Sequence, residues 1–142
     1  AAILANQSNT VVNAMKLYGM HLGTAFQLID DVLDYQADAD ELGKNIGDDL
    51  AEGKPTLPLI YALRQTSGEE QQLLKDAIEH ANGMQHLDRI LAILQRTNAF
   101  VYTRKIAEQE ADKAKSAIAF LPEGPYKQAL ETLADIAVER SH

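Results

Sequence analysis

The sequence predicts an all-α fold, and three observations support this prediction. Alanine, leucine, isoleucine, glutamate and lysine fill most of the sequence between four prolines and eight glycines, and these residues favour helices. Apolar residues recur at spacings of three and four, as they do on one face of a helix. The alternation that is typical of a half-buried strand is almost absent. We therefore expect about six helices, no sheet, and a single helical domain over residues 1–142.

Size and composition exclude several classes of protein. With 142 residues and 46% hydrophobic residues, the chain is long enough to bury a core. It has no cysteine, which excludes disulfides, thiol nucleophiles and zinc–thiolate sites. A net charge of -8 argues against a nucleic-acid partner, because such proteins bind mainly through phosphates. No transmembrane segment or signal peptide is visible in the sequence, so we expect a cytoplasmic protein.

The first complete helix is predicted to be the longest. Residues 1–6 resemble the last turn of an earlier helix, so the sequence starts within a pattern and is expected to be a fragment. Ser8 or Asn9 can cap the next helix, which is predicted from about Thr10 to Tyr35. At ~1.5 Å per residue, this helix would be roughly 40 Å long. Residues 36–54 are polar and rich in glycine, and are expected to form a loop with room for one short helical turn.

Five shorter helices are expected after this loop. Thr56 can cap the first of them, because Pro58 follows in its first turn, and this helix is expected to end near Gln65. Glycine, asparagine and proline separate the others. These four helices are predicted at about 69–79, 84–95, 99–121 and 126–140.

The longest predicted helix has a narrow acidic face. Gln27, Asp30, Asp31 and Asp34 are spaced at i, i+3, i+4 and i+7, and both flanks of this face are apolar. Carboxylates four residues apart repel each other by ~0.2–0.5 kcal/mol. The helix dipole adds ~0.3–1 kcal/mol for each exposed acid near the C-terminal end. A bound cation would reverse these costs, although a solvated face that receives its cations from a neighbouring helix is the alternative.

The ligand type and the loop that follows indicate which cation would bind. Carboxylates without nearby cysteine or histidine suit Mg²⁺ or Ca²⁺, and few protein ligands on one helix favour Mg²⁺ completed by substrate phosphates. The loop carries Gly43-Lys44 and Gly53-Lys54, with Asp48 and Asp49 between them. Glycine permits close approach of a ligand, and lysine binds phosphate oxygens as a point charge. Taken alone the loop could be merely flexible and solvated, but the two signals together predict a metal–diphosphate site.

Two segments resemble a known enzyme family. Residues 23–35, GTAFQLIDDVLDY, are similar to the second aspartate-rich motif of the trans-isoprenyl diphosphate synthases. Residues 42–59, LGKNIGDDLAEGKPTLPL, are similar to the segment that follows this motif in the same family. Within the family, the resemblance is to the bacterial long-chain branch, the octaprenyl diphosphate synthases. It extends over nearly the whole chain with decreasing sharpness.

The resemblance implies a prenyltransferase of isoprenoid biosynthesis. Such an enzyme uses Mg²⁺ to condense isopentenyl diphosphate head to tail onto an allylic diphosphate such as farnesyl diphosphate. The allylic diphosphate ionises, the double bond of isopentenyl diphosphate attacks the cation, and a proton is lost. Metal ions and lysines stabilise the departing diphosphate. The resemblance also implies an octaprenyl-type product and a homodimer.

Individual residues take their expected roles from the same resemblance. Asp30 would be a direct Mg²⁺ ligand, and Asp31 and Asp34 would complete the metal cluster, directly or through bound water. Asp49 would be a further metal residue outside the direct ligands. Substrate binding is expected of Phe26, Gln27, Lys44 and Lys54. The residues expected to be catalytic are Asp30, Asp31, Lys44 and Lys54.

The sequence also departs from the family. The synthases are about twice this length and carry a first aspartate-rich motif, whereas the DDxxD pattern occurs only once here, at Asp30–Asp34. We therefore expect the C-terminal half of a synthase, inactive alone and a weak Mg²⁺ binder. A non-catalytic helical subunit or regulator of a prenyl synthase is the alternative, and a metal-dependent terpene cyclase is a third possibility. The complete set of aspartates and lysines favours the synthase.

The histidines receive no catalytic role. His21 lies on a mostly apolar helix and is expected to be packed or partly exposed. His80, His86 and His142 are expected at the surface, with no carboxylate partner at ligand spacing.

Overall fold

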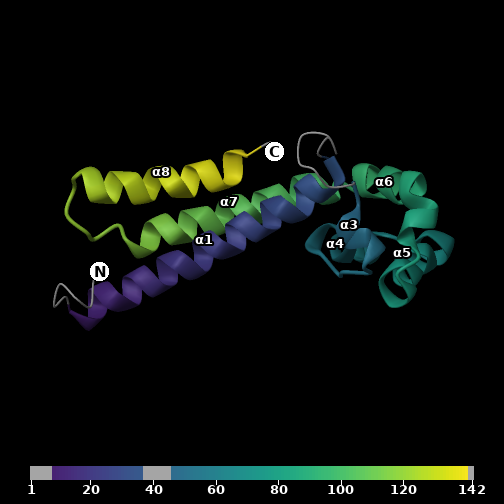
Figure 1. Cartoon of the computed structure of the whole chain (residues 1–142), viewed down its shortest axis with the longest axis horizontal. Coiled ribbons are helices and arrows are strands. Elements are labelled where there is room, and N and C mark those ends of the chain that lie inside the picture. The colour runs from purple at the N-terminus through teal and green to yellow at the C-terminus, as the bar shows by residue number, and fades with distance from the viewer. Residues whose placement is uncertain (1–7, 37–45, 141–142) are drawn as a thin grey trace. The chain divides into compact units, whose positions relative to one another are not determined.

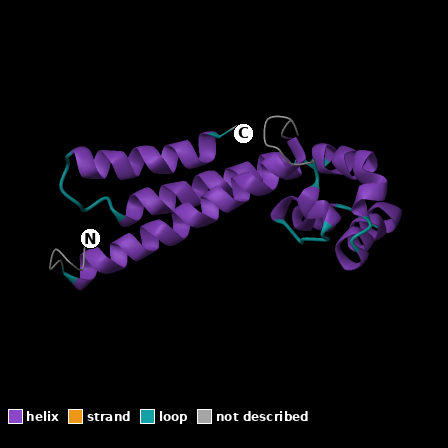
Figure 2. Ribbon diagram, viewed as in Figure 1, coloured by secondary structure: helices purple, strands orange, loops and turns teal. Residues whose placement is uncertain are grey.

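The computed structural model describes residues 8–36 and 46–140, and within these two ranges it contains helices and no strand. The all-α prediction is therefore confirmed, as Figure 2 shows. In the same ranges, no helix is both long enough and apolar enough to cross a bilayer. The elements are α1 (Asn9–Gln36), α3 (Asp48–Ala51), α4 (Leu57–Gln65), α5 (Gly68–His80), the 3₁₀ helix η1 (Gly83–His86), α6 (Leu87–Arg96), α7 (Ala99–Ala117) and α8 (Pro125–Glu139).

Most helix starts follow the local signals in the sequence. The Ser8 hydroxyl accepts a hydrogen bond of 3.4 Å from the backbone N–H of Val11, so Ser8 caps α1 as predicted. Thr56 is the residue before α4 and Pro58 lies in the first turn, although the Thr56 side chain makes no capping hydrogen bond. The short turn expected in the loop is α3, which begins directly after Gly47.

Two predicted helices have different ends in the structure. The helix expected at 84–95 begins with the 3₁₀ turn η1, whose first residue, the buried Gly83, packs so closely on Leu50 that an added Cβ would lie 2.5 Å from the Leu50 Cδ1 atom. The helix expected at 99–121 stops at Ala117. Beyond that residue the chain tightens, and the N–H of Leu121 donates to the carbonyl of Ile118 at 3.1 Å, three residues back.

The described residues form two compact units, and helices α1 and α7 contribute to both. We call residues 8–29 and 106–140 the three-helix unit, since they belong to α1, α7 and α8 (Figure 1). We call residues 30–36 and 46–105 the short-helix unit. The assignment of residues 1–142 to a single domain stays a prediction.

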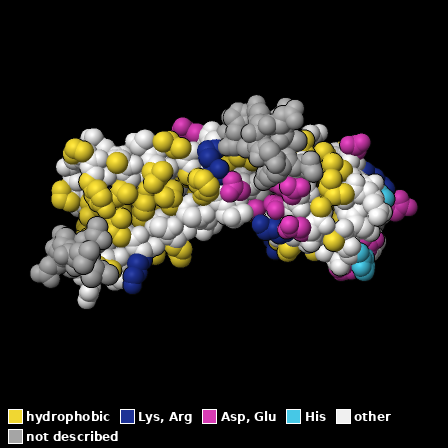
Figure 3. Space-filling model, viewed as in Figure 1, with side chains coloured by type: hydrophobic (Ala, Val, Ile, Leu, Met, Phe, Trp, Pro, Cys, Tyr) yellow, Lys and Arg dark blue, Asp and Glu magenta, His cyan; other side chains and the backbone are white. Residues whose placement is uncertain are grey.

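Small residues hold the three-helix unit together. Ala25, Ala111 and Ala134, one from each helix, are buried in one cluster, and their short side chains allow close packing. Tyr18 lies in a second cluster, and its hydroxyl donates to the carbonyl of Leu130 at 2.7 Å, which ties α1 to α8. Hydrophobic side chains also gather on the surface of this unit that faces the viewer in Figure 3. Among its exposed apolar residues are Leu17, Met20, Tyr126, Leu133 and Ile136.

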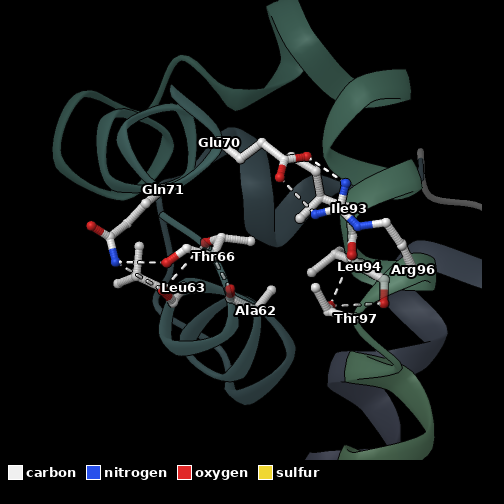
Figure 4. Close-up of polar contacts among 9 residues, drawn as sticks. All are labelled: Ala62, Leu63, Thr66, Glu70, Gln71, Ile93, Leu94, Arg96 and Thr97. Carbon is white, nitrogen blue, oxygen red and sulfur yellow. Dashed lines mark hydrogen bonds and ion pairs between the residues drawn. The ribbon is translucent and has the colours of Figure 1, made fainter. Parts of the chain in front are cut away.

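The short-helix unit has an aliphatic core and capped helix ends. Leu50, Leu59, Leu74, Ile90 and Leu94 are fully buried in one cluster. Threonines satisfy carbonyl groups at two helix C-termini (Figure 4). The Thr66 hydroxyl donates to Ala62 at 2.9 Å, and the Thr97 hydroxyl donates to Ile93 at 2.8 Å.

Candidate functional site

The acidic face lies on α1, as the spacing predicts. Gln27, Asp30, Asp31 and Asp34 all belong to this one helix, within its last three turns. Gln27 is exposed and Asp30 is half-buried, whereas Asp31 is 6% exposed and Asp34 only 1%. The face therefore runs from solvent into the core along the helix. Asp30 is its most accessible carboxylate.

Asp34 ties α1 to the start of α3. Its Oδ2 atom accepts a hydrogen bond of 3.1 Å from the backbone N–H of Asp49, and its backbone carbonyl accepts one of 2.9 Å from Gly47. Gly47 is buried and adopts the left-handed conformation with φ 84°, which glycine adopts without strain. The two bonds fix the chain that returns after residues 37–45 against the end of the acidic face.

Asp49 and Lys54 form the second part of the site. The Lys54 ammonium lies 3.8 Å from the Asp49 Oδ1 atom, and the backbone N–H of Lys54 donates to the Asp49 carbonyl at 3.0 Å. The Lys54 side chain is 46% exposed and that of Asp49 is 21% exposed. The lysine is thus anchored near the acidic cluster while its charge stays accessible to an anion. Asp49, expected from the family resemblance to be a further metal residue, is the residue that joins Asp34 to Lys54.

Gly53 sets the backbone just before this lysine. It has φ 72°, and an added Cβ would lie 2.8 Å from the carbonyl oxygen of Ile78 on α5. Both the left-handed backbone and the close approach require glycine at this position. The glycine of the second Gly-Lys pair therefore acts through packing against α5.

Tyr35, the last residue of the motif at 23–35, is buried beside the cluster, and no role at the site was predicted for it. Burial raises the pKa of its hydroxyl, and the charges of Asp34, Asp49 and Asp31 raise this pKa further, while the Thr56 hydroxyl lowers it. The phenol therefore stays protonated and neutral beside the carboxylates. Its ring packs on Phe100, with the ring centroids 5.7 Å apart. Burial identifies Tyr35 as a neighbour of the acidic cluster, and burial depends on the fold.

Phe26 and Lys44 are the remaining predicted site residues. Phe26 is 45% exposed and lies in the three-helix unit, where the guanidinium of Arg140 stacks on its ring. Arg140 is not among the residues predicted for the site. Lys44 lies outside the described residues, so its role stays a prediction.

One statement about the histidines is wrong. His80 does have a carboxylate at ligand spacing, because Asp76 lies one turn before it on α5, and ligand atoms of Asp76, Glu79 and His80 all lie within 4.8 Å of one another. The spacing of four residues between Asp76 and His80 indicates this arrangement in the sequence itself. His80 is at the surface as expected. His21 is packed between helices, and its Nδ1 atom lies 2.6 Å from Glu110 Oε2.

Comparison with known proteins gives consistent matches. The sequence profile of the polyprenyl synthetase family matches residues 1–94. The octaprenyl diphosphate synthase of Haemophilus influenzae is 48% identical over 142 residues, which are 100% of this chain and 43% of that protein. The chain thus spans less than half the length of this relative.

Two solved structures are similar in fold. The polyprenyl synthase of Caulobacter crescentus, complexed with calcium and isoprenyl diphosphate, matches with a TM-score of 0.90 and 39% identity over 99% of this chain and 43% of that chain. The geranylgeranyl pyrophosphate synthase of Corynebacterium glutamicum, complexed with isoprenyl diphosphate and magnesium, matches with a TM-score of 0.81 and 26% identity. This second match covers 96% of the present chain and 39% of the other.

Proposed function

Because this chain belongs to the polyprenyl synthetase family, we propose that it carries the second acidic motif of a long-chain polyprenyl diphosphate synthase. The proposed reaction is the head-to-tail condensation of isopentenyl diphosphate onto an allylic diphosphate such as farnesyl diphosphate. An octaprenyl-type product is proposed from the 48% identity to the Haemophilus influenzae enzyme. A cytoplasmic location is also proposed, and a homodimer is proposed from the family resemblance.

The observation that carries the proposal is the junction between α1 and α3. The Asp34 carboxylate accepts a hydrogen bond from the backbone N–H of Asp49. The Asp49 carboxylate in turn forms an ion pair with the Lys54 ammonium near the acidic face of α1. Carboxylates next to an accessible ammonium suit a ligand that combines a metal ion with a diphosphate.

The donor set fits a hard divalent cation. The candidates are carboxylate oxygens, and Asp30 is the most accessible of those on α1. We propose Mg²⁺, with Asp30 as the direct ligand, Asp31 beside it, and Asp49 as a further metal residue. Asp34 is so buried that its proposed part is to hold α3 in place. When bound, Mg²⁺ supplies positive charge that stabilises a departing diphosphate.

Other side chains of this chain would bind the allylic diphosphate directly. Lys54 would offset the charge of the allylic diphosphate with its exposed ammonium, and Lys44 is proposed to do the same. Gln27 and Phe26 lie on the exposed part of α1, one turn before the first aspartate, and would hold the reactive allylic end. Preorganised charges of this kind lower the barrier to ionisation because they need no rearrangement during the reaction.

The test is a condensation assay with and without a complementing polypeptide. Labelled isopentenyl diphosphate and farnesyl diphosphate are supplied with Mg²⁺ to this chain alone. In the second arm, the chain is mixed with the part of the Haemophilus influenzae enzyme that it does not match. We expect product only in the mixture, and loss of product in the Asp30→Ala variant. Asp88→Ala, an exposed aspartate on α6, is the matched control and should leave the rate unchanged.

One result would contradict the expected inactivity of this chain alone, and another would contradict the proposal. Turnover by this chain alone would show that the site is complete without the complementing part. Absence of turnover in the mixture, with both polypeptides eluting together as a folded complex in size-exclusion chromatography, would favour the non-catalytic helical subunit.

A further inference from the structure

Arg140 makes two contacts to one residue that lies 114 positions earlier in the chain. Its guanidinium carbon is 3.6 Å from the centroid of the Phe26 ring, and its Nη2 atom donates a hydrogen bond of 3.0 Å to the Phe26 carbonyl oxygen. Arg140 directly follows the last residue of α8 and has extended backbone angles, φ -58° and ψ 139°. The end of α8 is therefore fastened to both the ring and the backbone of Phe26.

These contacts restrict the orientation of the Phe26 side chain, which the packing of the three-helix unit does not determine. Phe26 is 45% exposed, so the core of the three-helix unit does not by itself determine the direction of its ring. The guanidinium plane stacked on the ring removes part of that freedom. In an α-helix, the carbonyl of residue 26 faces the N–H of residue 30, so the bond from Arg140 acts on the turn that contains Gln27.

Arginine is the residue type that can make both contacts. Its planar guanidinium can stack on an aromatic face and donate hydrogen bonds in its own plane. Lysine carries the same charge but has a compact ammonium without a plane, so it cannot reproduce this pair of contacts. The geometry therefore predicts a difference between two equally charged residues at position 140.

We propose that Arg140 is a positioning residue for the allylic substrate, which acts through Phe26. It holds the Phe26 ring and the following Gln27 in the orientation in which they receive the reactive allylic end. This inference rests on the proposed function, in which Phe26 and Gln27 bind that end. The competing view is that Arg140 only fastens α8 and has no effect on substrate binding.

The test separates substrate binding from folding. KM and kcat for farnesyl diphosphate are measured in the complemented enzyme for Arg140→Ala, Arg140→Lys and the control Arg89→Ala, an exposed arginine on α6. We expect Arg140→Ala to raise KM about five- to tenfold with kcat changed less than about twofold, since the cation–π contact and the hydrogen bond to Phe26 are lost. Arg140→Lys should give an intermediate KM, and Arg89→Ala should match the wild type.

A double variant tests whether Arg140 acts through Phe26. If it does, Phe26→Leu raises KM by itself, and adding Arg140→Ala raises it little further, because the two effects share one path. Independent effects that multiply in the double variant would overturn this route.

A spectroscopic readout needs no activity. In the 142-residue chain, the side-chain N–H resonances of Arg140 should shift upfield, because they lie over the Phe26 ring. This shift should vanish in Phe26→Leu, and its absence in the wild-type chain would contradict the inference.

The outcomes distinguish this inference from the proposed function. If the wild-type mixture does not condense the substrates, the proposed function fails and the inference falls with it. If the wild-type mixture is active and Arg140→Ala has the wild-type KM with a lowered unfolding temperature, Arg140 only fastens α8. In that case the proposed function stands and only the inference is overturned.

Discussion

The three aspartates of α1 have different surroundings although their spacing makes them look alike. Asp30 is half-buried and accessible, whereas Asp34 is 1% exposed and accepts a hydrogen bond from the backbone of Asp49. Burial of a carboxylate costs free energy unless the group is hydrogen-bonded. The contact with α3 supplies such a bond to Asp34. We infer that Asp30 contributes mainly to binding a ligand and Asp34 mainly to structure.

This difference leads to a prediction for Asp34. Asp34→Ala should lower the free energy of unfolding by about 1–3 kcal/mol, because the partly buried N–H of Asp49 loses its acceptor. Asp34→Asn should cost less, since its amide oxygen can still accept that bond. Urea denaturation followed by circular dichroism measures both. Equal stability of the alanine variant and the wild type would contradict the assigned contact.

At the scale of elements, the turn from α3 to α4 is shaped by its packing against α5. Gly53 lies in this turn, and α5 approaches it so closely that a Cβ has no room beside the Ile78 carbonyl. Because Lys54 follows directly, the close approach of α5 also fixes the backbone of a proposed substrate lysine. Packing between helices, and not only the flexibility of glycine, therefore determines this part of the site.

The corresponding prediction compares two glycines in left-handed conformation. Gly53→Ala should cost about 1–2 kcal/mol for the backbone and about 1–3 kcal/mol more for the clash. Gly68→Ala should show only the backbone cost, because nothing lies within 4 Å of its added Cβ. Equilibrium unfolding of both variants provides the comparison. Similar losses at the two positions would show that α5 does not approach Gly53 closely.

Helices α5 and α6 are joined by an ion pair whose contribution should depend on pH. The Arg96 guanidinium donates two hydrogen bonds of 2.7 Å to the carboxylate of Glu70 (Figure 4). These bonds, more than the charge attraction, lower the pKa of Glu70 below its ordinary value of 4.5. Folding therefore favours the ionised carboxylate. The pair stabilises the fold above pH 4.5, and this stabilisation is lost as the pH falls through the lower folded-state pKa.

A pH series checks this effect. Glu70→Gln should be less stable than the wild type at neutral pH, and the difference should shrink to zero well below pH 4.5. Added salt should also reduce it, because the pair is exposed. Glu69→Gln makes the same change of charge on the neighbouring residue and controls for the general charge effect. A difference that persists unchanged at low pH would exclude ionisation of Glu70 as its cause.

For the whole chain, the net charge of -8 and the acidic face make divalent cations the expected ligands in the absence of substrate. The chain spans 43% of the Haemophilus influenzae relative, so we expect its metal affinity to be weak before complementation. A ligand that binds only the folded state raises the free energy of unfolding by an amount that depends on concentration and affinity. Weak binding is therefore measurable as a change of stability.

Mg²⁺ should stabilise the isolated chain through Asp30. At a concentration ten times the dissociation constant, the gain is about 1.4 kcal/mol. Thermal or urea unfolding is measured over a Mg²⁺ series at constant ionic strength. Asp30→Ala should remove most of the gain, whereas Asp88→Ala should retain it. Retention of the full gain in Asp30→Ala would place the metal elsewhere.

Local signals were sufficient for much of the fold and for the α1 part of the site. The Ser8 cap, Pro58 in the first turn of α4 and the acidic face of α1 all depend on residues within about one or two turns of each other. Helix periodicity and capping act over that distance, and the sequence displays them directly. The helix predicted from about 84 begins as a 3₁₀ turn at Gly83, whereas the helix predicted to reach 121 ends at Ala117, beyond which the chain forms a tighter turn.

The sequence by itself determined the helical class, the family and the spacing of the aspartates. Only the tertiary structure decided that Asp34 is buried against α3, that Gly53 faces a carbonyl of α5, and that Arg140 lies on Phe26. The physical reason is sequence separation. A helix turn joins residues three or four positions apart, whereas the contact of Arg140 with Phe26 spans 114 positions and exists only once the helices have packed.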